Sequence, residues 1–384
     1  MATADWLGSP PADEPSLTMW ALARMASVAG AAGADAPPVR ARVRTREIDR
    51  GLRLGGRFGD RVLSVSGPAE PRGAGGASAE TSEDDVSGVP GVSDAEGPAD
   101  PAVTALFDPA VLVRDFARVR AAPAVRLGRP CVALRVRPHP VWADPHSPWC
   151  PPGAREARLV LDVATGCLLE AELVTSRGVA THCEVVEFAS AAGMPDGPAA
   201  VRGGVWRAPA PRGADAAGWA LARMAVTLAE PCSVAAEVTM ATEPRDVTFD
   251  GLPSPGSSRH WRVGVTGPDG LRQELLMGDG YDPQDVPVPV ARLAELLTPG
   301  RVVSHLAAVS AQEAEPEVPG PGVHITASVR PWRTFPFAAW APEDGLNCAF
   351  RVDAATGLLV RALLRDTSGD VLADYRCTVT GTEP

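Results

Sequence analysis

The sequence predicts an α+β protein made of two tandem domains, each an antiparallel sheet with a few short helices. Three observations predict this class. The heptapeptide Trp-Ala-Leu-Ala-Arg-Met-Ala occurs twice, at 20–26 and at 219–225. Alternating, strand-like segments follow both copies in the same order, and both halves end on the same hairpin motif. A chain of 384 residues with a hydrophobic share of 45% has room for cores of ordinary size.

The elements of the two halves match in chain order. After each heptapeptide helix come an alternating strand, a short segment with helical spacing of apolar residues, a further strand and a Pro-rich stretch that ends in tryptophan. The closing unit is the clearest, because Leu161–Leu173 and Val352–Leu364 share the pattern Asp-x-x-Thr-Gly before an apolar strand. Glycine-containing turns then lead into a last strand. The other matched segments are 39–45 with 234–240, 108–119 with 288–297, and 132–138 with 325–331.

These matches divide the chain into a flexible N-terminal segment 1–17, a first repeat 18–190, a linker 191–214 and a second repeat 215–382. The segment 66–104 interrupts the first repeat. It holds eight acidic residues and one arginine, a charge of −7 within a chain total of −11. The segment is rich in Gly, Ser and Pro and has no aromatic residue, so we expect a disordered acidic insert.

Composition excludes several functions. The chain has no lysine, so it cannot carry a P-loop, a pyridoxal phosphate Schiff base or a protein-kinase active site. It has no Gly-x-Ser-x-Gly, no His-Glu-x-x-His and no dinucleotide-binding glycine motif, and its six histidines are scattered. The net charge of −11 does not favour nucleic acid as a partner. We therefore expect neither a cofactor nor catalysis.

The start of the chain predicts a cytoplasmic location. It carries acidic residues and no arginine before the first apolar stretch, whereas a secretory signal needs a positive region and an apolar core. No apolar run approaches the length of a transmembrane helix, so no integral membrane contact is expected.

The cysteines predict buried, reduced thiols. There are seven, an odd number, in apolar strand-like runs without Cys-x-x-Cys spacing. One stretch gathers five groups of the kind that bind zinc, but their spacing fits no zinc template. The equivalent stretch 325–340 has no ligand residue, so we expect no metal. The five groups are Cys131, His139, Asp144, His146 and Cys150.

Four arginines alternate with small or apolar residues at Arg40, Arg42, Arg44 and Arg46. Alternation along a strand places all four guanidinium groups on one face of a sheet. Such a stripe suits an anion or an acidic partner, and the acidic insert is one such partner within the chain. The alternative is a solvated face without a ligand.

The order of elements in each half resembles the LolA/RseB-like family. The matching stretches are Asp162–Leu169 and Asp353–Leu359, with the turns at Gly178 and 366–369. The resemblance implies a strongly curved antiparallel sheet, a half-barrel lidded by helices, whose hollow takes acyl chains or other apolar groups. It brings no catalytic residues. Members of the family are exported, whereas this chain starts without a signal peptide, so either its start is misassigned or it is a cytoplasmic relative.

Large apolar side chains recur at matched positions in both halves. They are either core anchors that hold the helix on the sheet or the lining of the hollow against an apolar ligand. The ligand-cavity candidates are Trp20, Leu22, Met25, Trp149, Trp219, Leu221, Met224 and Trp340.

The function predicted from the sequence is a non-catalytic binding protein that holds or senses an apolar, lipid-like ligand in one or both half-barrels. The alternative is a cytoplasmic interaction scaffold that has lost its ligand and whose repeats dock on each other or on a protein partner. An enzyme with an unrecognised site is the third hypothesis.

Overall fold

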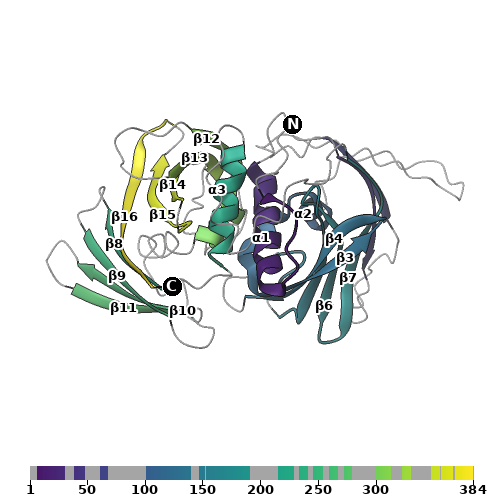
Figure 1. Ribbon diagram of the computed structural model, residues 1–384, viewed down its shortest axis with the longest axis horizontal. Helices are drawn as coiled ribbons and strands as arrows, with labels where there is room; N and C mark the ends of the chain where they lie inside the picture. The colour runs from purple at the N-terminus through teal and green to yellow at the C-terminus, as the bar shows by residue number, and fades with distance from the viewer. Residues whose placement is uncertain are drawn as a thin grey trace, which may run out of the picture.

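A computed structural model covers the chain, and it describes sixteen stretches. They are residues 7–30, 39–47, 61–67, 101–139, 147–151, 153–190, 215–228, 233–240, 245–253, 259–266, 272–278, 299–312, 322–329, 347–354, 356–365 and 368–383. The fold is α+β, with two curved antiparallel sheets and a pair of helices between them (Figure 1). The predicted fold class is confirmed.

The first sheet has seven strands in the order β2-β1-β7-β6-β5-β4-β3, and all neighbours are antiparallel. Arg126 at the end of the edge strand β3 forms an ion pair with Glu184 of β7, although three strands lie between β3 and β7. This ion pair indicates that the sheet is curved enough to bring the end of β3 close to β6 and β7. The strands are β1 (Val39–Glu47), β2 (Arg61–Gly67), β3 (Phe116–Arg126), β4 (Arg129–Pro138), β5 (Glu156–Asp162), β6 (Leu168–Thr175) and β7 (Gly178–Ser190).

The second sheet has nine strands in the order β11-β10-β9-β8-β16-β15-β14-β13-β12. Without β10 and β11 this order is that of the first sheet, strand for strand. A register shift between Val160 and Leu161 in the first sheet has its counterpart between Arg351 and Val352 in the second. The strands are β8 (Ser233–Met240), β9 (Arg245–Pro253), β10 (Arg259–Thr266), β11 (Arg272–Gly278), β12 (Leu306–Gln312), β13 (Gly322–Val329), β14 (Asn347–Asp353), β15 (Leu359–Arg365) and β16 (Val371–Glu383).

The two heptapeptides lie in α1 (Glu14–Gly30) and α3 (Asp215–Val226), which pack side by side in the middle of the molecule (Figure 1). The start of α1 is fixed by Asp13, whose carboxylate accepts a hydrogen bond of 2.9 Å from the backbone N–H of Ser16, as N-capping residues do. This bond lowers the pKa of Asp13. Shorter helical segments precede the edge strands. They are α2 (Pro101–Phe107), η2 (Pro109–Asp115), η5 (Pro299–Arg301) and η6 (Val303–His305).

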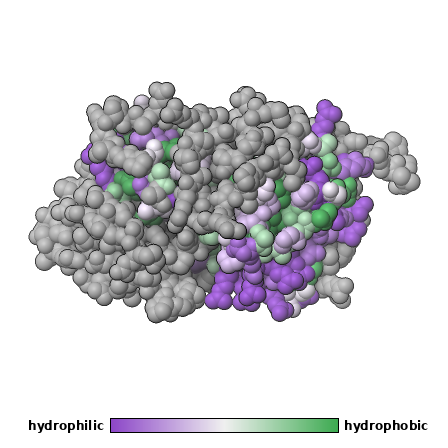
Figure 2. All heavy atoms as spheres, in the orientation of Figure 1, coloured by the Kyte–Doolittle hydropathy of each residue, from purple (hydrophilic) through white to green (hydrophobic). Residues whose placement is uncertain are grey.

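A single hydrophobic core includes residues from both halves. In β4 and β5 alternate side chains point into it, while the intervening ones face solvent, as the period of a half-buried strand requires. All residues of α3 from Ala216 to Val226 are buried, so this part of the helix has no solvent face. Hydrophilic side chains gather on the lower edge of the first half in the view of Figure 2.

The structure differs from the sequence-based boundaries in three places. Leu7 is 1% exposed, so the segment expected to be flexible contains a residue packed in the core, while Ala12 and Asp13 before α1 are exposed. Pro101–Phe107 is a helix with three buried residues, which shortens the predicted insert at its end. Within 108–119 only Pro109–Asp115 is helical, and Phe116 already begins β3. The remaining repeat and linker boundaries stay predictions.

Residues 68–100 of the acidic insert and the expected helix at 288–297 lie outside the described residues.

Candidate functional site

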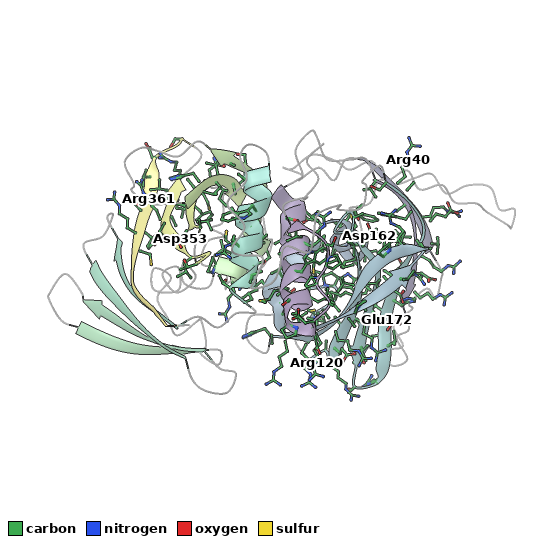
Figure 3. All side chains as sticks on the ribbon, viewed as in Figure 1. Arg40, Arg120, Asp162, Glu172, Asp353 and Arg361 are labelled. Carbon is green, nitrogen blue, oxygen red and sulfur yellow. The ribbon has the colours of Figure 1, made fainter. Side chains whose placement is uncertain are left out.

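The Asp-x-x-Thr-Gly motif forms the same turn in both halves. Asp162 accepts hydrogen bonds from the backbone N–H of Thr165 at 2.9 Å and from its hydroxyl at 2.7 Å. Asp353 accepts the same two bonds from Thr356, both at 2.7 Å. The two turns lie on opposite sides of the helix pair (Figure 3). The motif is thus a self-contained turn that closes the β5–β6 and β14–β15 hairpins.

Each turn is attached to the helix of its own half by the arginine of the heptapeptide. Arg24 donates to the backbone carbonyl of Val163 at 3.2 Å and also to that of Ala164. Arg223 donates to the carbonyl of Ala354 at 3.0 Å. The two motifs that recur in the sequence are therefore the two sides of one contact, which we call the helix–turn contact.

Glycine ends the motif because the helix leaves no space for a side chain. Gly166 and Gly357 have φ angles of +77° and +76°, in the left-handed region that favours glycine. A Cβ atom on Gly166 would lie 2.7 Å from Cγ2 of Val28, and one on Gly357 would lie 2.8 Å from the carbonyl oxygen of Arg223.

In the first half a further arginine holds the turn. Arg129 donates to both carboxylate oxygens of Asp162, at 2.8 and 3.0 Å, and Asp162 is 1% exposed. The hydrogen bond to Asp162 raises the pKa of Arg129. The guanidinium group also lies 5.2 Å from the ring centroid of Phe188, within the range of a cation–π contact.

The ligand-cavity candidates that the structure describes all belong to the hydrophobic core and are at most 1% exposed. The indole N–H of Trp20 donates to the carbonyl of Gly8 at 3.1 Å, and that of Trp149 to the carbonyl of Ala102 at 3.2 Å. The indole nitrogen of Trp219 has no acceptor among the described residues. Trp340 lies outside them. Contact with an apolar ligand stays a prediction for Leu22, Met25, Leu221, Met224 and the four tryptophans.

The two halves are joined through their helices. Helix α1 packs against α3, and η2 packs against η6. Beside this contact the buried side chains of Arg114 and His305 meet, with Nη1 of the arginine 2.8 Å from Nε2 of the histidine. Sequence reasoning offered docking of the two repeats on each other only within the alternative scaffold function, and it did not assign that contact to the heptapeptide helices. The signal it could have used is the apolar character of the heptapeptide on every side, which a helix lying on one sheet does not need.

The arginine stripe of β1 is partly neutralised by β7. Arg42 pairs with Glu187 at 2.8 Å and Arg44 with Glu184 at 3.2 Å, while Arg40 and Arg46 at its ends are exposed. Binding of an anion or an acidic partner by the stripe stays a prediction.

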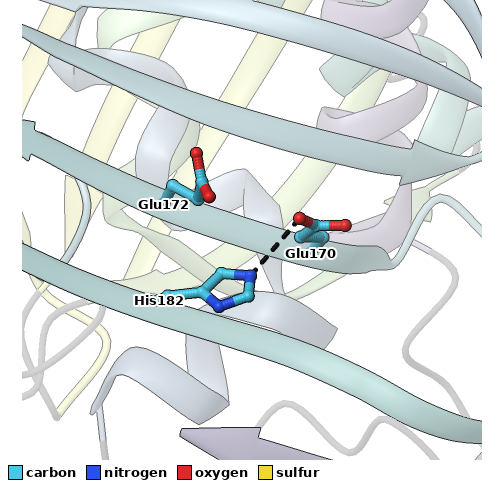
Figure 4. Close-up of side chains that lie close together, drawn as sticks. All are labelled: Glu170, Glu172 and His182. Atoms are coloured by element: carbon cyan, nitrogen blue, oxygen red, sulfur yellow. Dashed lines mark hydrogen bonds and ion pairs between the residues drawn. The ribbon is translucent and has the colours of Figure 1, made fainter. Parts of the chain in front are cut away.

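The same face of the first sheet carries a cluster of Glu170, Glu172 and His182, whose ligating atoms lie within 4.8 Å of one another (Figure 4). His182 Nε2 lies 3.3 Å from an oxygen of Glu170. Both carboxylates already face arginines: Arg126 is 3.4 Å from Glu170, and Arg158 is 3.4 Å from Glu172. The cluster has no surplus of negative charge and is better described as part of an ion-pair network than as a cation site.

Glu184 belongs to this network. Partial burial would raise its pKa, but the hydrogen bond and the charge of Arg126 oppose burial, with smaller contributions from His182 and Arg44, so its pKa is lowered overall.

The six cysteines that the structure describes are buried, and none of them forms a disulfide with another described cysteine. Burial raises the pKa of Cys131 and of Cys167 to about 11 and that of Cys377 to about 12. The prediction of buried thiols is confirmed for all six described cysteines. Asp144 and His146 of the zinc-like stretch lie outside the described residues. Within those residues, Cys131, His139 and Cys150 form no three-ligand cluster.

Among the described residues no helix is long and apolar enough to span a bilayer. No protein-family model matches the chain, and no curated protein matches it.

Solved structures of MucB are similar to the chain at low identity. A structure of MucB in complex with MucA(peri) is 15% identical with a TM-score of 0.25, and the match spans 40% of this chain and about half (49%) of that chain. MucB alone is 14% identical with a TM-score of 0.24 over 71% of this chain and 94% of that one. The MucA/MucB complex of Pseudomonas aeruginosa is 13% identical with a TM-score of 0.23 over 94% and 93%. Likeness at this level carries no argument about the family or the function of this chain.

Proposed function

We propose that the chain is a non-catalytic interaction scaffold in which two sheets are held as one body by a shared pair of helices. The observation that carries the proposal is the packing of α1 against α3, with both heptapeptide tryptophans 0% exposed. A protein that admits ligands between helix and sheet needs a helix that can lift or a space that stays open. Here each helix is enclosed by its own sheet and by the other helix.

The helix–turn contacts oppose such lifting. A hydrogen bond to a charged donor contributes about 1.5–3 kcal/mol, and Arg24 and Arg223 each tie a helix to its hairpin. Removal of a large core side chain costs about 3–5 kcal/mol, so a ligand that displaced Trp20 or Trp219 would have to offset a loss of that size. These energies favour two fixed sheets with functional surfaces on their solvent-facing sides.

Differential scanning calorimetry tests whether the protein is one body. We expect one cooperative transition, whose midpoint falls in both Arg24→Ala and Arg223→Ala, because each variant loosens a helix that the two halves share. Two transitions, with each variant shifting only one of them, would refute the proposal.

Native mass spectrometry tests the absence of a resident ligand. We expect the mass of the bare chain, unchanged after incubation with palmitate or phosphatidylcholine vesicles. A stoichiometric lipid adduct that survives purification would contradict the scaffold function.

A second candidate function is to hold an apolar ligand within the second half, and one observation favours it. Trp219 is fully buried, and its indole nitrogen has no acceptor among the described residues, whereas Trp20 donates to Gly8. An ester or carboxyl oxygen of a ligand could accept that bond. Under this function Trp219→Phe lowers the occupancy of a lipid adduct and Trp20→Phe does not. Equal occupancy in both variants would exclude it.

A further inference from the structure

A block of four arginines lies at the edge of the first sheet. The proposed scaffold function rests on the helix pair and gives these arginines no role. Cross-strand register places Arg118 opposite Arg137 and Arg120 opposite Arg135. All four are exposed, while Val119 and Val136 between them face the other side of the sheet. Figure 3 shows Arg120 projecting from the lower edge of the first half, where hydrophilic side chains gather in Figure 2. We call these four residues the arginine block.

The arginine block differs from its neighbours on the same face of the sheet. Arg42, Arg44, Arg126 and Arg158 each pair with a glutamate. Arg120, Arg135 and Arg137 form no ion pair with any described residue, and Arg158 of the next strand lies directly opposite Arg135. Like charges at directly opposed positions destabilise a sheet. The block is therefore a concentrated positive patch beside a balanced surface, in a chain whose net charge is −11.

The chain contains a segment of matching charge. Glu80, Glu83, Asp84 and Asp85 place four carboxylates within six residues of the acidic insert. We propose that residues 80–85 dock on the arginine block within the same chain. Paired arginine and carboxylate groups form strong, geometrically matched hydrogen bonds, and Arg120, Arg135 and Arg137 are exposed and available for them.

The lengths of chain on both sides of this segment are sufficient. β2 and β3 are the opposite edges of the sheet, six strand spacings of about 4.8 Å apart, or about 29 Å. The register places Gly67 about seven residues, or about 23 Å, along the strands from the row of Arg135, so the span is about 37 Å. The insert leaves the sheet at Gly67, the end of β2. The thirteen residues from there to Glu80 reach about 43 Å when extended, at about 3.3 Å per residue. From Asp85 the chain returns to Pro101, where α2 packs against β6.

Attachment to the same chain favours this occupant over others. A tethered segment faces its site at an effective concentration of about millimolar, which compensates for the weakness of individual surface ion pairs. Nucleic acid and anionic membranes have no such tether, and the overall negative charge of the chain repels them. The proposal goes beyond the scaffold function and does not depend on it, because it concerns the solvent-facing side of the first sheet.

Arginine modification by phenylglyoxal, measured residue by residue by mass spectrometry, tests the docking in the full chain. The decisive variant is Glu80→Gln/Glu83→Gln/Asp84→Asn/Asp85→Asn, which keeps the length of the insert. We expect the modification rates of Arg120, Arg135 and Arg137 to rise several-fold in this variant at low salt. Arg155 and Arg177, which are exposed elsewhere on the same half, serve as internal controls, and their rates should not change.

A matched variant separates docking from the general charge of the insert. Asp94→Asn/Glu96→Gln/Asp100→Asn removes three other acids from the insert and should leave the block protected. High salt should expose the block in the natural chain, because the Debye length falls from about 10 Å at 0.1 M to about 3 Å at 1 M. Equal rates in the natural chain and the quadruple variant would overturn the proposal, as would an equal rise in both variants. If the block arginines stay protected from modification in the quadruple variant and lose that protection when the protein is diluted, the block binds an acidic segment of another molecule and the proposal is wrong.

Discussion

Replacement of Gly166 by alanine tests the helix–turn contact directly. Two costs combine at this position. A non-glycine residue in the left-handed region costs about 1–2 kcal/mol, and the new Cβ atom would lie 2.7 Å from Cγ2 of Val28, an overpacking that typically costs about 1–3 kcal/mol. We expect Gly166→Ala to lower the free energy of unfolding by about 2–5 kcal/mol in total.

Gly128→Ala is the matched control. Gly128 has a φ angle of +71°, close to the +77° of Gly166, but nothing lies within 4 Å of its added Cβ atom. Both substitutions restrict the unfolded chain alike, so that effect cancels in the difference. Urea unfolding followed by tryptophan fluorescence should show Gly166→Ala to be the less stable variant by about 1–3 kcal/mol. Equal stability of the two variants would refute the close packing of the turn against α1.

Three further predictions concern the first half and the cysteines. Leu127 has a φ angle of +52° and precedes Gly128 in the β3–β4 turn, so Leu127→Asn should raise the free energy of unfolding by about 1 kcal/mol; an unchanged urea midpoint would argue against strain there. The pKa of Glu184 is lowered in the folded state, so its contribution to stability is present above its usual pKa and is lost as the pH falls through the lowered value. The stability difference between the natural chain and Glu184→Gln should therefore be largest near neutral pH and vanish in acid, and a difference independent of pH would contradict the ion pair with Arg126. Burial and pKa values of about 11 to 12 should make Cys131, Cys167 and Cys377 inert to an aromatic disulfide reagent until urea unfolds the chain, which peptide mapping would show; prompt labelling of any of the three would refute their burial.

Local patterns predicted the strands and the closing turn. Alternation in β4 and β5 and the Asp-x-x-Thr-Gly motif are short-range signals, and their structure follows from neighbouring residues. The helix predicted over 108–119 was too long, because the chain enters the edge of the sheet at Phe116 and pairing with β4 overrides helical spacing.

The long-range contacts could not be predicted from the sequence. Arg24 meets a carbonyl 139 residues away, and no local pattern identifies that acceptor. The neutralisation of Arg42 and Arg44 depends on the register of β1 with β7, where a shift between Arg42 and Val43 brings Glu187 and Glu184 opposite them. Buried tryptophans, in turn, have the same sequence pattern whether they fill a core or line a pocket.

The packing of α1 against α3 has a consequence for how the two heptapeptides can diverge. A residue in these helices must suit its sheet, its hairpin turn and the opposite helix together. A change in one copy therefore alters the surroundings of the other and survives only if the second copy accepts it or changes as well. Such mutual dependence gives a physical reason why these seven residues are identical while the strands on both sides differ.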